Sequence, residues 1–295
     1  MYDFGTIYQP KTIKEAMELK VEHPKALILA GGSDILIKIR EGKLAGCDLI
    51  SIFMLDELRG ICMEEDGTIL IRPLTSFSHV TANPIIKKYL PALGDAVDQV
   101  GGPQIRNIGT IGGNICNGVT SADSAPTLKA YDAELEISSL KGTRIMNYLD
   151  FNLGFAKVDL REGEFLTGIR IKKESYLDTY GQYIKYSMRK AMDIATLGCS
   201  VNVRLSEDKK TIKRLRIAFG VAAPTPIRCF EAEKISLKRS LDQKLLDDVA
   251  LACQKEVNPR TSWRASKEFR LHLIKELSQK ALFESIEKAG GKVNA

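Results

Sequence analysis

Closely spaced cysteines are absent from this 295-residue sequence, although it has six cysteines. They lie far apart along the chain, as Cys47, Cys62, Cys116, Cys199, Cys229 and Cys253. Metal sites and redox disulfides rely on close spacing, because one short turn must bring two ligands to one centre. We therefore predict that most of these cysteines are small buried side chains, with no metal site and no iron–sulfur cluster in this chain.

Histidine and the familiar nucleotide motifs are also scarce. The three histidines, His23, His79 and His272, form no H-E-x-x-H motif and no close pair with cysteine. A zinc hydrolase or a histidine-dependent triad therefore has little support. The sequence also has no G-x-G-x-x-G after a strand and no G-x-x-x-x-G-K-S/T. The usual dinucleotide-binding fold is thus unsupported, and a P-loop is excluded.

Long apolar runs and basic-aromatic stripes are missing as well. The longest apolar run near the start, residues 26–30, is far too short to span a bilayer, and no signal-peptide pattern precedes it. The formal net charge is +6, but the Lys and Arg residues are dispersed rather than interleaved with aromatic side chains. We expect a cytoplasmic protein with a solvated basic surface, and neither a membrane nor a nucleic acid as partner.

The chain that remains is an ordinary globular sequence, 44% hydrophobic and 27% charged, with the length of two domains. Residues 1–175 are predicted to be an α+β region. Its expected elements are a helix over 12–23, a buried strand over 26–30, a short helix or turn over 35–39, strands at 49–53, 69–73 and 135–138, and helix over 84–100. Residues 176–295 are predicted to form an antiparallel sheet with strands at 183–189, 197–205 and 211–222, followed by helices from 241 and over 266–288.

A first glycine-rich turn follows the predicted strand at 26–30, in the phrase "LILAGGSD". Gly31 and Gly32 let the backbone approach a ligand closely, and their N–H groups can solvate a phosphate. Ser33 adds a hydroxyl donor. Asp34 would repel a phosphate, so we expect it to cap the next helix or to reach a sugar hydroxyl. Taken alone, the phrase is also compatible with a plain strand-to-helix turn.

A second glycine-rich segment spans residues 101–118, and we predict that it forms no regular helix. Its many glycines lose much backbone entropy on folding, which favours a functional loop over a structural connector. Thr110, Asn114 and free N–H groups at Gly112 and Gly113 suit a diphosphate. Asp123, just downstream, can accept a hydrogen bond from a ribityl or ribose hydroxyl.

These two segments resemble a known signature. "LILAGGSDILI" and, about seventy residues later, "IRNIGTIGGNICNGVTSADSAP" are similar to the two loops of the FAD domain of molybdenum hydroxylases. "YSMRKAMDIATLGCSV", "AFGVAAPTPIRC" and "PRTSWRASKEFRLHLI" are similar to the second domain of the same subunits. The resemblance implies a vanillyl-alcohol-oxidase-type (PCMH) FAD-binding domain of two α/β subdomains over 1–175. A CO-dehydrogenase-flavoprotein-like domain of antiparallel sheet and helices follows over 176–295.

Within that family the sequence is most similar to bacterial xanthine dehydrogenase flavin subunits. The resemblance implies FAD as cofactor and no catalytic residue in this chain. It assigns FAD contacts to Leu27, Ile28, Leu29, Ala30, Gly31, Gly32, Ser33, Asp34, Gly109, Thr110, Gly112, Gly113, Asn114, Asp123, Leu166 and Lys185. Val100 stands where eukaryotic relatives have an aromatic side chain, so no ring stacking is implied there.

The resemblance also implies partners. A large subunit would hold molybdopterin and hydroxylate hypoxanthine or xanthine, and a small subunit would carry two 2Fe–2S clusters. This chain would pass their electrons through FAD to NAD⁺, in a dimer of heterotrimers, with oxygen as the alternative acceptor. Two other interpretations remain: the flavin subunit of a related hydroxylase for an aldehyde, carbon monoxide or a heteroaromatic ring, or a cofactor-free basic scaffold or RNA-binding protein.

Overall fold

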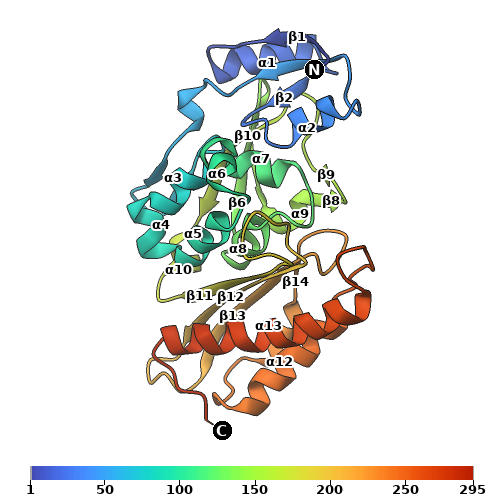
Figure 1. Ribbon diagram of the computed structural model, residues 1–295. Coiled ribbons are helices and arrows are strands. Elements are labelled where there is room, and N and C mark those ends of the chain that lie inside the picture. Colours follow the sequence, from blue (N-terminus) through green and yellow to red (C-terminus); the bar gives the residue numbers. More distant parts are fainter. Residues whose placement is uncertain (1, 295) are drawn as a thin grey trace.

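The structure is a computed structural model that describes residues 2–294, and its three larger sheets define three units stacked along one axis (Figure 1). We call them the amino-terminal lobe, the middle lobe and the carboxyl-terminal domain. Each has its own hydrophobic core. The long helix α13 lies at the end of the stack opposite to strand β1 (Figure 1).

The amino-terminal lobe is a three-stranded parallel sheet in the order β1-β3-β2 with two helices. Its elements are β1 (Phe4–Tyr8), α1 (Ile13–Glu22), β2 (Leu27–Leu29), α2 (Ile35–Arg40), β3 (Cys47–Ser51) and the 3₁₀ turn η1 (Asp56–Leu58). The predicted first helix is confirmed, and the Thr12 side chain caps it by accepting from the Glu15 N–H at 3.1 Å. The predicted buried strand is only half-buried, because β2 lines a cavity instead of a closed core.

The middle lobe is built on a five-stranded antiparallel sheet in the order β4-β5-β10-β6-β7. Its elements are β4 (Ile61–Met63), β5 (Ile69–Ile71), α3 (Phe77–Ala82), α4 (Pro84–Tyr89), α5 (Pro91–Asp98), α6 (Pro103–Ile108), α7 (Ile111–Cys116), α8 (Ser124–Ala130), β6 (Glu134–Ser139), β7 (Gly142–Asn147), α9 (Tyr148–Phe151), β8 (Asn152–Gly154), β9 (Lys157–Val158), β10 (Phe165–Ile171) and α10 (Lys173–Tyr176). Leu135, Ile137, Ile169 and Ile171 are fully buried in its core, as alternating strand positions require.

The prediction that residues 101–118 form no regular helix is wrong. The segment forms the two six-residue helices α6 and α7. Pro103 begins α6, where a missing N–H costs nothing, and the Thr110 hydroxyl caps α7. The predicted helix over 84–100 is divided at Leu90, because Pro91 begins a new helix there.

The carboxyl-terminal domain is a four-stranded antiparallel sheet in the order β11-β12-β13-β14. Its elements are β11 (Tyr180–Tyr186), β12 (Leu197–Leu205), β13 (Ile212–Gly220), β14 (Ile227–Arg228), α11 (Phe230–Ile235), α12 (Gln243–Glu256) and α13 (Lys267–Lys288). The hairpin turn between β12 and β13 is confirmed, with Lys209 at φ +59°. The predicted strand over 183–189 ends three residues early, because residues after Tyr186 turn back through a hydrogen bond from the Arg189 N–H to Asp193.

The carboxyl-terminal sheet lies between its own helices and the middle lobe. Helices α12 and α13 pack on one side, and α5 and α8 of the middle lobe contact β11, β12 and β13 (Figure 1). Arg216 and Arg228 of this sheet form ion pairs with Asp132, just after α8. The domain boundary at 175/176 stays a prediction. Among residues 2–294, no helix combines the length and apolar character needed to cross a membrane.

Candidate cofactor-binding site

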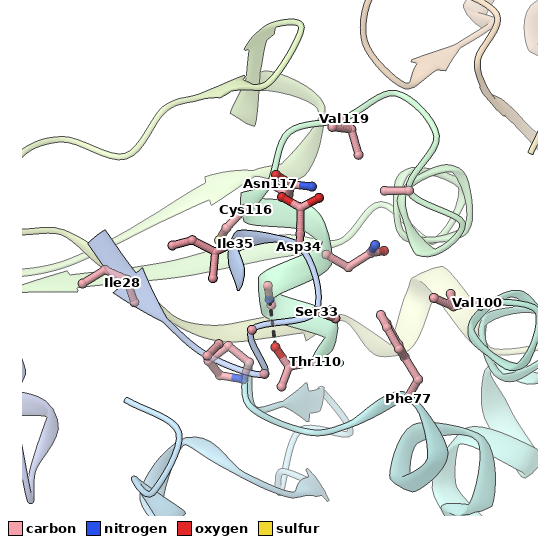
Figure 2. Close-up of a pocket in the computed structure, with 18 of the residues that line it drawn as sticks. Ile28, Ser33, Asp34, Ile35, Phe77, Val100, Thr110, Cys116, Asn117 and Val119 are labelled. Carbon is pink, nitrogen blue, oxygen red and sulfur yellow. Dashed lines mark hydrogen bonds between the residues drawn. The ribbon is translucent and has the colours of Figure 1, made fainter. Parts of the chain in front are cut away.

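A cavity of about 760 Å³ opens where the amino-terminal and middle lobes meet. Its wall comes from β2 and the turn after it, from α7, from residues 119 and 121–123, and from the start of β10. Figure 2 labels Ile28, Ser33 and Val119 among these lining residues. Residues 192–194 of the carboxyl-terminal domain complete the wall. The volume lies in the upper part of the range of ligand pockets, about 300–1,000 Å³.

The first glycine-rich turn lines this cavity and has unused backbone donors. In the portion of the chain that the structure describes, none of the backbone N–H groups of residues 31–35 donates a hydrogen bond. Gly32 has φ +72°, and its carbonyl oxygen accepts the N–H of Leu36 at 3.1 Å as α2 begins. A run of free N–H groups on one turn can surround an anion. This turn therefore has the donor set that a diphosphate requires.

The expected helix cap at Asp34 is wrong, because its side chain caps no N–H group of α2. Its Oδ2 atom instead lies 2.6 Å from the Nζ atom of Lys38, one helical turn later. Lys38 also donates to Oδ1 of Asn117 at 3.3 Å, so it links α2 to the end of α7. Figure 2 shows Asp34 and Asn117 together at the cavity wall. Contact of Asp34 with a sugar hydroxyl stays a prediction.

The second glycine-rich segment has a different role from the one predicted. The N–H of Gly112 donates to the carbonyl oxygen of Pro73 at 2.9 Å. The N–H of Gly113 donates to Oγ1 of Thr110 at 3.1 Å, the dashed line at Thr110 in Figure 2. Neither N–H group is free. A short helix needs its first donors satisfied, and here a neighbouring loop and the cap satisfy them.

Glycines are required in both segments because the backbones approach closely. A Cβ atom on Gly31 would lie 1.9 Å from the carbonyl oxygen of Ile108. A Cβ atom on Gly112 would lie 2.4 Å from Cβ of Pro73. The second segment therefore supports the first from behind and contributes wall surface at Gly113, which is exposed.

A buried carboxylate stands at the other end of the cavity wall. Asp123 is only 6% exposed, and its Oδ2 atom lies 2.9 Å from Nζ of Lys185. The hydroxyl of Tyr183 donates to its Oδ1 atom at 2.7 Å. Burial raises the pKa of Asp123, and the ion pair with Lys185 and the two hydrogen bonds oppose that rise. The sequence reasoning missed Tyr183, although it precedes Lys185 by two residues and therefore shares its face of β11.

Most of the predicted contact residues line the cavity. These are Leu27, Ile28, Ala30, Gly31, Gly32, Ser33, Asp34, Thr110, Gly112, Gly113, Asn114, Asp123 and Leu166. Leu29, Gly109 and Lys185 do not line it: Leu29 packs toward Gly32, Gly109 lies against Phe77, and Lys185 reaches Asp123 from behind the wall. Val100 does line the cavity beside Phe77, an aromatic wall residue that the sequence reasoning missed (Figure 2).

The charges in the wall are balanced. Four acidic side chains and one lysine line the cavity, and every one of the four has a basic partner. The pairs are Asp34–Lys38 at 2.6 Å, Asp123–Lys185 at 2.9 Å, Glu164–Arg144 at 2.8 Å and Asp193–Arg189 at 3.7 Å. Hydrogen bonding to Arg144 lowers the pKa of Glu164. The wall therefore presents no unpaired carboxylate that would repel a diphosphate.

The six cysteines are all unpaired thiols, and their burial differs from one domain to the next. Cys199, Cys229 and Cys253 are buried in the carboxyl-terminal core, Cys47 and Cys116 are half-buried, and Cys62 is exposed. Cys116 lines the cavity, and burial raises the pKa of its thiol to about 12. Over residues 2–294, no group of three or more His, Cys, Asp or Glu side chains is arranged to hold a metal ion.

Comparison with known proteins identifies the family. Residues 2–172 match the family described as the FAD-binding domain in molybdopterin dehydrogenase, and residues 182–285 match the CO dehydrogenase flavoprotein C-terminal domain. The chain is 42% identical over 293 residues to the xanthine dehydrogenase FAD-binding subunit of Escherichia coli O157:H7, which covers 99% of this chain and 100% of that one. It is 29% identical over 274 residues to the glyceraldehyde dehydrogenase medium chain of Sulfolobus acidocaldarius, with 93% and 95% covered.

A solved structure agrees with these sequence matches. A chain of carbon monoxide dehydrogenase from Hydrogenophaga pseudoflava superposes with a TM-score of 0.92 at 28% identity, covering 98% of this chain and 99% of that one. The chain belongs to the FAD-binding subunits of the molybdopterin dehydrogenases. FAD is the cofactor of this chain, and the predicted α+β fold with its flavoprotein-like second domain is confirmed. The cofactor-free alternative is therefore wrong.

Proposed function

We propose that this chain is the flavin subunit of a xanthine dehydrogenase-like molybdenum hydroxylase, with FAD bound in the cavity between the two glycine-rich segments. The single observation that supports the xanthine dehydrogenase assignment is the 42% identity to a FAD-binding subunit of that enzyme over the full length of both chains. The medium chains of glyceraldehyde dehydrogenase and of carbon monoxide dehydrogenase are each only 29% identical to this chain.

The cavity wall supports a division of roles among the residues. The free N–H groups of residues 31–35 are proposed to hold the diphosphate, because they are the unused donors of the first turn. Asp123 is proposed to accept a hydrogen bond from a ribityl or ribose hydroxyl. Apolar side chains, among them Leu166 and Phe77, are available to flank the ring system. Thr110, Gly112, Gly113 and Asn114 form the part of the wall next to the first turn, whereas Leu29, Gly109 and Lys185 support the wall from behind.

The wall also explains why we assign no catalytic residue to this chain. FAD, when bound, supplies the redox chemistry, because a flavin exchanges electrons singly or in pairs. The protein places the cofactor and adjusts its electrostatic surroundings. All four acidic side chains of the wall have a basic partner, an arrangement that fits a role in holding the cofactor.

The proposed assembly follows from the family assignment. A large subunit with molybdopterin would hydroxylate hypoxanthine or xanthine, and a small subunit with two 2Fe–2S clusters would pass electrons to this chain. NAD⁺ is the proposed final acceptor, and a dimer of heterotrimers in the cytoplasm is the proposed form. The rival assignment, an aldehyde-oxidising hydroxylase, is supported only by the 29% identity to the glyceraldehyde dehydrogenase chain.

The test is to purify the full chain with its native partners from the source cells through a tag on this chain. We expect a flavin spectrum, two co-purifying subunits that carry molybdenum and iron, and NAD⁺ reduction with hypoxanthine or xanthine. The same preparation is assayed with glyceraldehyde, carbon monoxide and nicotinate, and with oxygen in place of NAD⁺. A complex that oxidises glyceraldehyde but neither purine refutes the purine assignment while leaving the flavin role in place.

A further inference from the structure

Two glycines leave a gap in the side chains of the carboxyl-terminal sheet, directly behind the cavity wall. Gly198 of β12 pairs with Gly220 of β13, and Lys185 of β11 pairs with Gly198 on its other side. A Cβ atom on Gly198 would lie 2.8 Å from the hydroxyl oxygen of Tyr183, and one on Gly220 would lie 3.0 Å from the carbonyl oxygen of Thr120. A Cβ atom would displace the Tyr183 hydroxyl at Gly198 and press on the Thr120 carbonyl at Gly220, so glycine at both positions lets the two groups approach the sheet.

The segment that lies over this gap belongs to the cavity wall. Val119, Ser121, Ala122 and Asp123 all line the cavity. Thr120, between them, is held by the other domain: its carbonyl oxygen accepts the N–H of Val221 at 3.0 Å, and its hydroxyl donates to the carbonyl oxygen of Ala223 at 3.0 Å. One end of the segment is thus fixed by hydrogen bonds between Thr120 and the backbone of the carboxyl-terminal domain.

The other end of the segment is fixed by side chains of β11. Tyr183 and Asp123 are only 3% and 6% exposed, so their hydrogen bond is shielded from water. The ammonium group of Lys185 donates to Oδ2 of Asp123 and to the carbonyl oxygen of Gln99, at 2.9 Å each. The tyrosine hydroxyl is therefore the donor that fixes Oδ1, while Lys185 fixes Oδ2. Burial, together with the charge of Asp123, raises the pKa of Tyr183 well above its usual value, so the hydroxyl keeps its proton.

We propose that Tyr183 is a positioning residue for FAD, through which the carboxyl-terminal domain holds the Asp123 carboxylate in the orientation that the cofactor needs. Gly198 is part of this arrangement because it provides the space for the Tyr183 hydroxyl. Neither residue lines the cavity, so both act through Asp123. The proposal rests on the proposed function in one respect, namely that Asp123 contacts FAD.

Loss of the tyrosine hydroxyl has two expected effects on the cofactor. The carboxylate of Asp123 loses one of its two fixed partners and turns away from its orientation, which weakens FAD binding. Asp123 also loses a hydrogen bond that stabilises its negative charge. It therefore neutralises less of the positive charge of Lys185, and the surroundings of the flavin become more positive. Because the reduced flavin is more negative than the oxidised one, the midpoint potential is expected to rise.

The experiment uses the full chain with Tyr183→Phe, which keeps the ring and removes only the hydroxyl. We expect the dissociation constant of oxidised FAD to rise about tenfold, measured by flavin fluorescence on titrating the apoprotein. If reduced FAD is unaffected, that tenfold difference corresponds to a rise of about 30 mV in the potential for a two-electron couple. The control is Tyr180→Phe on the same strand, where the side chain is 41% exposed, and no change is expected.

A double-mutant cycle separates this proposal from the role of Asp123 itself. If Tyr183 acts through Asp123, then Tyr183→Phe has no further effect on FAD affinity or potential in an Asp123→Asn background. Unchanged FAD affinity in Asp123→Asn alone would refute the contact between Asp123 and FAD. Weaker binding in Asp123→Asn but wild-type affinity and potential in Tyr183→Phe would overturn only the positioning role.

A second variant keeps the test decisive if Tyr183→Phe does not fold. Gly198→Ala retains the hydroxyl but displaces it, because the new Cβ atom would lie 2.8 Å from that oxygen. We expect the same direction of change in affinity and potential as for Tyr183→Phe. A folded Gly198→Ala chain with wild-type values for both would overturn the proposal.

Discussion

Gly31→Ala tests the contact between the two glycine-rich segments most directly. The new Cβ atom would lie 1.9 Å from the carbonyl oxygen of Ile108, 2.8 Å from its carbonyl carbon and 3.2 Å from Cα of Gly109. Ordinary contact begins at 3.4 Å, so the shortfall at the oxygen is roughly 1.5 Å. All three atoms are backbone, so no rotation of a side chain relieves the clash. The turn must move as a whole, and its free N–H groups move with it.

The expected loss of FAD affinity follows from the free-energy cost of overpacking, which is about 1–3 kcal/mol. Where that cost falls on the FAD-bound state, it weakens binding by roughly 5- to 150-fold, since about 1.4 kcal/mol is tenfold in an equilibrium constant. The assay is a titration of the apoprotein with FAD, with circular dichroism to confirm folding. Gly154→Ala is the matched control, because a Cβ atom there meets nothing within 4 Å and the position needs no positive φ.

Unchanged FAD affinity in Gly31→Ala is the result that would refute this prediction. If folded Gly31→Ala binds FAD as tightly as both the wild type and Gly154→Ala, then the position of the first turn does not matter to the cofactor. The diphosphate would then have to lie elsewhere in the cavity.

Two further predictions concern the second segment and a buried lysine. Gly113→Val should abolish FAD retention in a folded chain. Gly113 is exposed in the cavity wall, so the valine methyl groups would occupy the space of the ligand. A normal flavin content in the purified variant would contradict this prediction. Lys129 is 2% exposed and donates to the carbonyl oxygen of Tyr148 at 3.1 Å, and burial lowers its pKa from 10.5 to about 8. Between pH 8 and 10.5 the unfolded chain therefore binds more protons, so stability should rise with pH by up to about 1.4 kcal/mol per unit. Urea unfolding of Lys129→Met should lack that rise, and parallel pH profiles for the two proteins would show that the lysine is not the cause.

Local patterns were sufficient for the regular elements. The helix at Ile13–Glu22 was predictable because its cap, Thr12, and its apolar spacing lie within a dozen residues. The long helix that begins after Ser266 and stops before Gly290 was predictable for the same reason, as was the turn at Lys209. In each case the deciding interactions join residues close in the chain.

The sequence by itself also determined the family and most of the cavity wall, because both glycine-rich segments are contiguous. Only the tertiary structure decided which of their N–H groups are free. Those of Gly112 and Gly113 are satisfied by Pro73 and Thr110, whereas those of residues 31–35 are not. The cap from Thr110 to Gly113 is local to the chain, but the bond from Gly112 to Pro73 joins residues 39 apart and leaves no periodic signal in either segment.

The contribution of the carboxyl-terminal domain to the site depends on the same kind of distant contact. Asp123 and Lys185 were foreseen as separate contacts, but the structure joins them in one ion pair and adds Tyr183. The sequence lacks the usual dinucleotide-binding and P-loop motifs, and its two loops indicate FAD. The orientation of the groups around that cofactor is set by the packing of one domain on another, and only the folded chain brings those residues together.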